Sequence, residues 1–297
     1  MRRKPLLVVL ALILTISLTG CGLFFQSPGT GSLAIYLADL PGDLEEVNVF
    51  IDRVEVKRNG EQWETINDFN DFNGTPEVFD LLELQYFEAL LGEKELSAGE
   101  YNQIRLIVAA PEENDTEPGD IAEASHIVKD GELIPLHIPS GMQTGLKMHY
   151  NFTVVENYIT ELILDVDVER LIEAGKSGKY ILHPTEFIYV FDKAILGEII
   201  GRVLEDDGND GEVIDPDITI TLYRVENGEK EEIRTLTAIR NGEALDGSFK
   251  FRGLSEGEYE LEIEADDFVT KNVTEITVKA GKTNDLGDIL LEKDETD

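Results

Sequence analysis

The stretch GSFKFRGLSEGEYELEIE, residues 247–264, indicates the fold class most directly. On both sides of its central glycines, apolar residues alternate with polar ones, which is the period of a strand that buries one face and exposes the other. Gly253 and Gly257 favour a tight connection between two such strands. The side chains expected to face a core are Phe249, Phe251, Tyr259, Leu261 and Ile263. This stretch therefore predicts neighbouring strands of a β-sandwich.

The same alternation recurs towards the N-terminus. Leu33, Ile35 and Leu37 share one face of a predicted strand, and a second run at 47–51 follows Pro41-Gly42. Further strands are predicted at 103–108, 146–155, 159–168 and 180–190, with one or two helical turns each at 81–91 and 168–174. The predicted fold class is all-β with minor helical inserts, arranged as two β-sandwich domains.

Two dipeptides predict hairpins. Asn59-Gly60 and Asp130-Gly131 each stand between runs with strand character. Residues of these types tolerate the positive φ angles of a two-residue type I′ turn. Both positions are therefore expected to join antiparallel strands.

The N-terminus has the three parts of an export signal: Arg2, Arg3 and Lys4, an apolar run at 6–18, and small residues. The run has thirteen residues, fewer than the roughly 20 that a membrane-spanning helix needs. Its last part, Leu18-Thr19-Gly20-Cys21, resembles the bacterial lipobox. That resemblance implies cleavage before Cys21 and a lipid on its sulfur, while the alternative is a chance cysteine beside an ordinary cleavage site.

These patterns predict five segments: a signal peptide at 1–20, a flexible tether at 21–31, an N-terminal domain at 32–192, a C-terminal domain at 195–292 and an acidic tail at 293–297. The predicted location is outside the cytoplasm. The predicted partner is a membrane, to which the lipid on Cys21 attaches the chain, either at the outer face of the cell membrane or at the outer membrane.

The chain is strongly acidic. It has 25 Lys and Arg against 61 Asp and Glu, a net charge of −36, and removal of the three basic residues of the leader makes it 22 − 61 = −39. Such a charge repels phosphate backbones, so nucleic-acid binding is excluded. Ordinary solubility and adaptation to salt both explain the carboxylates. With Cys21 as its single cysteine, the chain forms no intramolecular disulfide.

Several stretches of the N-terminal domain resemble a known family, the domain of unknown function 4382 of bacterial and archaeal surface lipoproteins. The resemblance extends over about 31–191 and implies location and architecture but no chemistry. The matching stretches are SLAIYLADLP at 32–41, VNVFIDRVEV at 47–56, GEYNQIRLIV at 99–108, IPSGMQTGLK at 138–147 and YILHP at 180–184.

The C-terminal domain resembles another family. GEIIGRV at 197–203 and the stretch at 247–261 are similar to the carboxypeptidase regulatory-like domain. This resemblance implies a seven-stranded, transthyretin-like and Ig-like sandwich that serves as a spacer, adhesion module or accessory binding unit. It implies no peptidase activity.

One acidic loop is a candidate calcium site. Ca²⁺ prefers several oxygen ligands from a flexible acidic loop. The candidate ligands are Asp206, Asp207, Asn209, Asp210 and Glu212. Gly208 stands where an EF-hand loop has a ligand, so a solvated turn is the alternative, and the loop at 112–120 is a weaker candidate. Apart from this possible Ca²⁺, no cofactor is predicted.

No catalytic residue is predicted. The four histidines, His126, His137, His149 and His183, lack the short spacing of metal ligands. Two rows of carboxylates are candidates for acid–base chemistry, but their regular alternation favours exposed sheet faces. The rows are Glu258, Glu260, Glu262 and Glu264, and Glu161, Asp165 and Asp167.

Three aromatic residues offer faces on which a sugar ring can stack, Trp63, Tyr36 and Tyr223, although strand aromatics more often pack in a sheet. The leading hypothesis is a non-catalytic surface lipoprotein that binds, adheres or acts as a scaffold, with an extracellular glycan or protein as partner. The alternatives are a carbohydrate-binding module, with or without calcium, and a glycosidase or metal-dependent hydrolase. The sequence names no ligand-binding residue.

Overall fold

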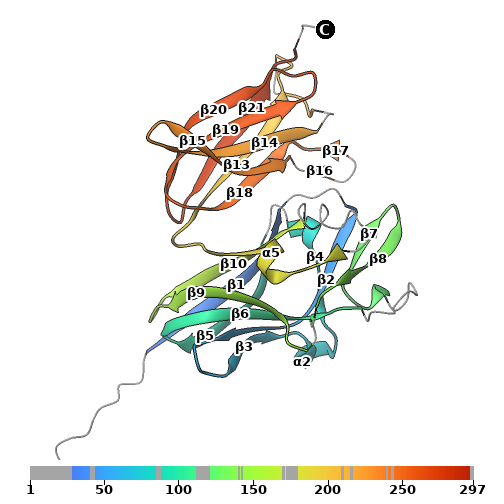
Figure 1. Cartoon of the computed structure of the whole chain (residues 1–297), viewed down its shortest axis with the longest axis vertical. Helices are drawn as coiled ribbons and strands as arrows, with labels where there is room; N and C mark the ends of the chain where they lie inside the picture. The colour runs from blue at the N-terminus through green and yellow to red at the C-terminus, as the bar shows by residue number, and fades with distance from the viewer. Residues whose placement is uncertain are drawn as a thin grey trace, which may run out of the picture.

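The computed structural model shows a chain built almost entirely of strands, which confirms the predicted fold class. Two domains with separate cores lie one above the other along the long axis of the molecule (Figure 1). The structure describes residues 29–40, 44–84, 88–111, 121–139, 141, 143–168, 171, 180–208, 211–214, 217–238, 240–241 and 244–294.

One sheet of the N-terminal domain is four-stranded and mixed. Its order is β12 (Ile188–Asp192), β10 (Ile159–Asp167), β1 (Thr30–Leu40) and β5 (Ala89–Ser97). Strands β1 and β10 run parallel, with Ser32 opposite Ile159 and Leu40 opposite Asp167, while both outer strands are antiparallel to their neighbours. The two central strands therefore begin at one edge of the domain and end at the other.

The second sheet of this domain is built around the long strand β2 (Glu46–Lys57). It runs β11 (Tyr180–Ile181), β8 (Glu132–His137), β7 (His126–Lys129), β2, β6 (Gly99–Ala109), β9 (Leu146–Val154), and β3 (Trp63–Asp68) and β4 (Glu77–Asp80) also pair with β2. Short helical inserts are α2 (Asn70–Asn73), η1 (Leu81–Leu84) and α5 (Pro184–Phe187).

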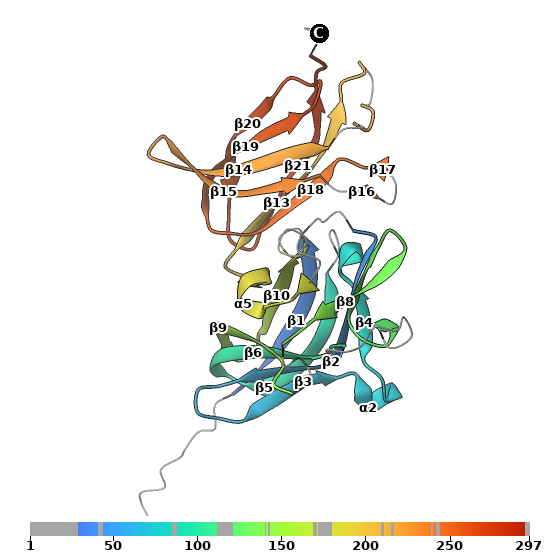
Figure 2. The same ribbon diagram turned by 45° about the vertical axis from the view of Figure 1, so that its right-hand side comes forward.

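The core between these two sheets follows from period-two alternation. Leu33, Ile35 and Leu37 of β1 are buried as predicted, and the inward residues of β2 and β6 pack against them. Towards its end β1 is buried on both faces, since the consecutive residues Ala38 and Asp39 are both inaccessible to solvent. The outer face is covered there because the C-terminal domain lies against it (Figure 2).

The C-terminal domain is a sandwich of three strands against four, the number that the family resemblance implies. One sheet is β18 (Ser248–Leu254), β13 (Gly197–Glu205) and β21 (Thr283–Leu291), and the other is β15 (Glu229–Thr237), β14 (Ile218–Glu226), β19 (Gly257–Ala265) and β20 (Lys271–Val278). A small hairpin joins β16 (Arg240–Asn241) to β17 (Ala244–Leu245). All five residues predicted to face its core are buried.

The two hairpin predictions have different outcomes. Asp130 and Gly131 both have positive φ between β7 and β8, as a type I′ turn requires. Asn59 and Gly60 do join β2 to β3, but only Gly60 has positive φ, and the amide of Glu61 closes the turn on the Arg58 carbonyl. The type I′ prediction there was wrong because the connection is longer than two residues.

Two longer predictions were also wrong in part. The strand predicted at 180–190 is divided by the helical turn α5, because Pro184 at its first position favours a helix start and cannot donate to a sheet. The helical turn predicted at 81–91 ends at Leu84, and β5 begins at Ala89. Most of the helical turn predicted at 168–174 lies outside the described residues.

Candidate functional site at the domain junction

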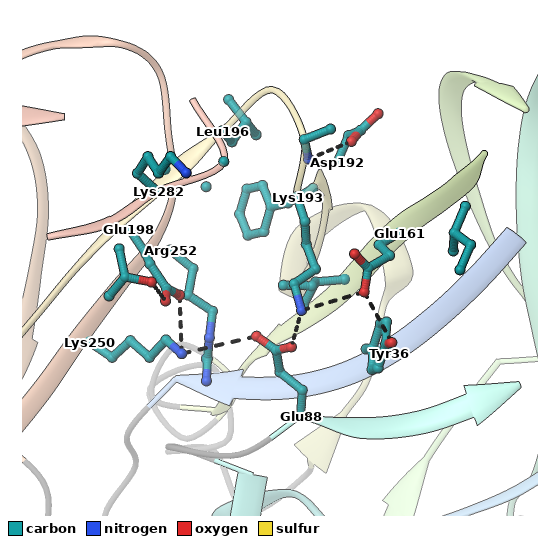
Figure 3. Close-up of a pocket in the computed structure, with 18 residues that line it drawn as sticks. Tyr36, Glu88, Glu161, Asp192, Lys193, Leu196, Glu198, Lys250, Arg252 and Lys282 are labelled. Carbon is teal, nitrogen blue, oxygen red and sulfur yellow. Dashed lines mark hydrogen bonds and ion pairs between the residues drawn. The ribbon is translucent and has the colours of Figure 1, made fainter. Parts of the chain in front are cut away.

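A cavity of about 660 Å³ lies between the two domains (Figure 3). Strands β1 and β10 and the segment after β12 line it from the N-terminal domain, and β13, β18 and the turn before β21 line it from the C-terminal domain. Clefts between domains are common places for ligands, and this cleft is therefore the candidate site. We call it and the buried contacts beside it the junction.

Arg252 of β18 is the central residue of the junction and is only 1% exposed. Because Phe249 and Phe251 face the core of their own sandwich, the alternation turns Arg252 outwards, towards the other domain. Its Nη1 donates to the Asp39 carbonyl oxygen at 2.8 Å and to Asp165 Oδ1 at 3.2 Å, and its Nη2 is 3.5 Å from the Leu84 carbonyl oxygen. One side chain thus connects β18 to three elements of the N-terminal domain.

Two buried carboxylates accompany this one guanidinium. Burial raises the pKa of Asp39 well above its ordinary value and the nearby Asp165 raises it further, while Arg252 and the Val168 amide lower it less. Burial also raises the pKa of Asp165, against the lowering effect of Arg252 and Arg234. The side-chain ion pair of Arg252 is made with Asp165, so a charge on Asp39 is less well supported. The ion pair therefore favours the charged form of Asp165, and burial favours the neutral form of Asp39.

The wall of the cavity carries a second set of ion pairs, less buried than the first (Figure 3). Lys193 Nζ is 2.7 Å from Glu88 Oε2 and 4.0 Å from Glu161 Oε1. On the other side, Lys250 Nζ is 3.1 Å from Glu198 Oε2 and 4.0 Å from Glu88 Oε1. Glu88 therefore lies between a lysine of the interdomain segment and a lysine of the C-terminal domain.

Close packing completes the junction. Gly253 has a φ of +70°, and a Cβ there would stand 2.1 Å from the ring of Phe191 in β12. Next to it, the guanidinium of Arg234 in β15 lies 5.5 Å from the ring centre of Tyr189, also in β12. The requirement for glycine at 253 comes from the approach of the other domain as well as from its backbone angle.

The described residues of the cavity wall do not form a pair in which one group is suited to act as a general acid and the other as a general base. Burial would raise the pKa of Glu198, but hydrogen bonding by Thr283 and the charge of Lys250 lower it below its ordinary range. A general acid needs a raised pKa, so Glu198 is suited to remain charged. Tyr36 donates its hydroxyl proton to Glu161 at 3.1 Å. Glu88, Glu161 and Glu198 of the wall thus each have a cationic or hydroxyl partner.

The candidate calcium loop is described only in part, since Asn209 and Asp210 lie outside the described residues. Asp206 accepts a hydrogen bond from the Gly208 amide and Asp207 accepts one from the Gly211 amide, both at 3.0 Å. Glu212 pairs through its backbone with Glu205. The described part of the chain brings no three His, Cys, Asp or Glu side chains together as a metal site, and calcium binding stays a prediction.

The lipobox residues Leu18, Thr19, Gly20 and Cys21 lie outside the described residues, as does the weaker acidic loop at 112–120. Within the described ranges, no helix has the length and apolar character needed to span a bilayer. The predicted lipid on Cys21 therefore stays a prediction.

One carboxylate row was misread from the sequence. Asp165 was expected on an exposed face with Glu161 and Asp167, but it is fully buried because the C-terminal domain covers that end of β10. The row on β19 is closer to expectation: Glu258 and Glu264 are exposed, while Glu260 and Glu262 are half-buried. Lys230 and the Tyr223 hydroxyl contact these two half-buried glutamates.

A cation stands over each of the three aromatic rings considered for sugar stacking. Arg105 lies 4.2 Å from the ring centre of Trp63, and Lys193 lies 4.6 Å from that of Tyr36. Lys230 is 5.9 Å from the ring centre of Tyr223. One face of each ring is thus engaged within the chain.

The sequence reasoning missed Arg252, Lys193 and Glu88 as residues of a shared site. The only local signal is the position of Arg252. It directly precedes Gly253 and stands between a core phenylalanine and a turn. Nothing in the alternation of a strand says which partner covers its outward face.

A family model described as a domain of unknown function (DUF4382) matches residues 30–184, about half of the chain. No sequence match was found among curated proteins. Among solved structures, the GBS52 minor pilin of Streptococcus agalactiae is 16% identical, with 90% of this chain and 98% of the pilin covered, at a TM-score of 0.26. The Bacillus anthracis TIE protein is 13% identical over 89% of this chain at a TM-score of 0.25, and the match spans only 34% of that protein. Likenesses at such TM-scores carry no argument about fold or function.

Proposed function

The chain belongs to the DUF4382 family, and we propose that its N-terminal domain is the base of a non-catalytic surface lipoprotein. In this proposal a lipid on Cys21 attaches the base to the membrane, and the base holds the C-terminal sandwich in a fixed orientation. The sandwich is the part that binds, adheres or serves as a scaffold outside the cell. Its resemblance to carboxypeptidase regulatory-like domains supports this division of roles.

The observation that carries the proposal is the path of strand β1. It starts at Thr30, nine residues after Cys21, and ends at Leu40 beside the contact between Asp39 and Arg252. In this proposal the anchor is at one end of β1 and the second domain is at the other. This arrangement would hold the second domain away from the bilayer. The buried Arg252 supports a stiff connection, because bending at the junction would expose an ion pair and open a packed contact.

The anchor is tested by the substitution Cys21→Ser in the full chain, with Ser27→Ala as a control in the same segment. We expect the unmodified chain and the control in the membrane fraction and accessible to protease added to intact cells. The Cys21→Ser variant should appear in the soluble exported fraction. Retention of Cys21→Ser in the membrane would overturn the lipid-anchored base.

The first partner to test is an extracellular glycan. The mature Cys21→Ser chain is applied to a glycan array in Ca²⁺ and in EDTA. A calcium-dependent signal that is lost in Asp206→Asn supports the carbohydrate-binding alternative and its metal loop. Binding without calcium that survives this substitution supports a glycan surface elsewhere on the sandwich. Absence of signal in both arms favours a protein partner or a scaffold role.

A further inference from the structure

Three large apolar residues are exposed within five positions of the turn between β9 and β10. Val155 is 46% exposed, Tyr158 is 69% exposed and Ile159 is 60% exposed. We call these three residues the apolar tip. Exposed apolar side chains are ordinary when single, but a cluster on a turn indicates a contact surface.

The apolar tip is held firmly against the beginning of β1. The Asn157 amide donates to the Thr30 carbonyl oxygen and the Ser32 amide donates to the Tyr158 carbonyl oxygen, both at 2.9 Å. Gly31 lies so close that a Cβ there would stand 2.1 Å from the Val155 carbonyl oxygen. The tip therefore has a defined position relative to the point where the chain enters the fold.

That entry point determines what can reach the tip. Seven residues stand between Cys21 and Gly29, the first described residue, and a fully extended chain spans about 28 Å from one to the other. Leu23, Phe24 and Phe25, which follow Cys21 and Gly22, add apolar character to this short segment. A lipid on Cys21 would hold the tip within this distance of the bilayer surface at all times, at a high effective concentration.

We infer that the apolar tip lies in the interfacial layer of the membrane that carries the lipid anchor, as a second and non-covalent contact. Tyr158 supplies an aromatic ring with a polar end, which is the side chain favoured at the boundary between head groups and hydrocarbon. Val155 supplies apolar area beside it, and Ile159 borders the same turn at the edge of the junction cavity. Glu156 stands in the same turn, so the contact suits a bilayer of low negative charge better than an anionic one.

The inference rests on the proposed lipid anchor, and the experiment separates the two. Cys21 is the only cysteine, and acylation would consume its thiol, so Tyr158→Cys in the lipidated chain provides a single site for an environment-sensitive fluorophore. The labelled protein is placed in phosphatidylcholine vesicles. The matched control is Val269→Cys in the C-terminal domain, where Val269 is 49% exposed and its amide donates to the Glu292 carbonyl oxygen.

We expect the fluorophore at 158 to shift its emission to shorter wavelength on vesicles and to be quenched by lipids labelled in the head-group region, while the one at 269 stays in an aqueous environment. If the protein remains on the vesicles but both fluorophores stay aqueous, the inference is wrong. A shift at 158 that needs high protein concentration but no vesicles would assign the tip to a second copy of the chain. Loss of the protein from the vesicles, with labelling of Cys21, would refute the anchor itself.

Discussion

The surroundings of the two ends of strand β1 differ in which side chains are exposed to solvent. At its beginning, Tyr158 and its apolar neighbours are exposed, while at its end Arg252, Asp165 and Asp39 are buried. The reversal shows that burial at the rim of a β-sandwich depends on what covers it. A second domain covers one end and supplies the cation for its carboxylates, and the apolar character of the other end suits a bilayer.

Loss of the guanidinium should have the largest effect. Arg252→Ala leaves Asp165 without its partner in a buried site, and we expect a loss of about 3 to 5 kcal/mol in the free energy of unfolding. The matched control is Arg202→Ala on β13, where Arg202 and Asp288 form an ion pair with both side chains close to half exposed. That control should cost at most about 1 kcal/mol. Chemical denaturation measures both, and equal losses would show that the junction contributes no special stability.

A methyl group at Gly253 should have the next largest effect. Gly253→Ala strains a φ of +70° and brings a Cβ against Phe191. We expect a loss of about 2 to 3 kcal/mol, from backbone strain and overpacking together. Gly228→Ala has a similar φ of +84° with no atom within 4 Å of the added Cβ, so it reports strain alone. A loss no larger than in Gly228→Ala would mean that the domains separate at no cost.

Neutralising Asp39 should have a smaller effect that depends on pH. Because burial raises its pKa, the native chain keeps a proton that the unfolded chain releases above its ordinary pKa. The stabilisation by this proton is complete below the ordinary pKa of an aspartate and is lost as pH rises through the raised pKa. Asp39→Asn avoids that loss, so we expect it to be more stable than the unmodified chain by about 1 kcal/mol at pH 8, with the difference shrinking at low pH. Asp71→Asn, at an exposed position, controls for net charge, and a stability gain in both variants would make the effect one of overall charge.

The smallest effect on stability should come from the other end of β1. Tyr158→Ser removes a side chain that is mostly in solvent, and we expect the free energy of unfolding in water to change by no more than about 0.5 kcal/mol. Thermal unfolding of the soluble Cys21→Ser chain checks this. A clearly larger loss would show that Tyr158 packs within the domain, and the comparison between the two ends of β1 would then fail.

Local pattern predicted much of what lies inside each domain. Alternation at 33–37 and at 247–264 identified core residues correctly, because a strand that covers a core must place every second side chain on it. Asp130-Gly131 identified its turn for a similarly local reason, namely its backbone angles. The prediction failed at Pro184, where a helix start competes with a strand, and at Asp165, where a neighbouring domain covers an outward face.

The sequence by itself determined the all-β class and the negative charge, since each depends on composition or on a period along the chain, and the family resemblance implied the seven strands of the C-terminal sandwich. Only the tertiary structure decided that Arg252 meets Asp165 and Asp39, and that the apolar tip stands beside the start of β1. These contacts join residues far apart in the chain. Their cause is the parallel pairing of β1 with β10 and the placement of one domain upon the other, and neither leaves a periodic signal in the sequence.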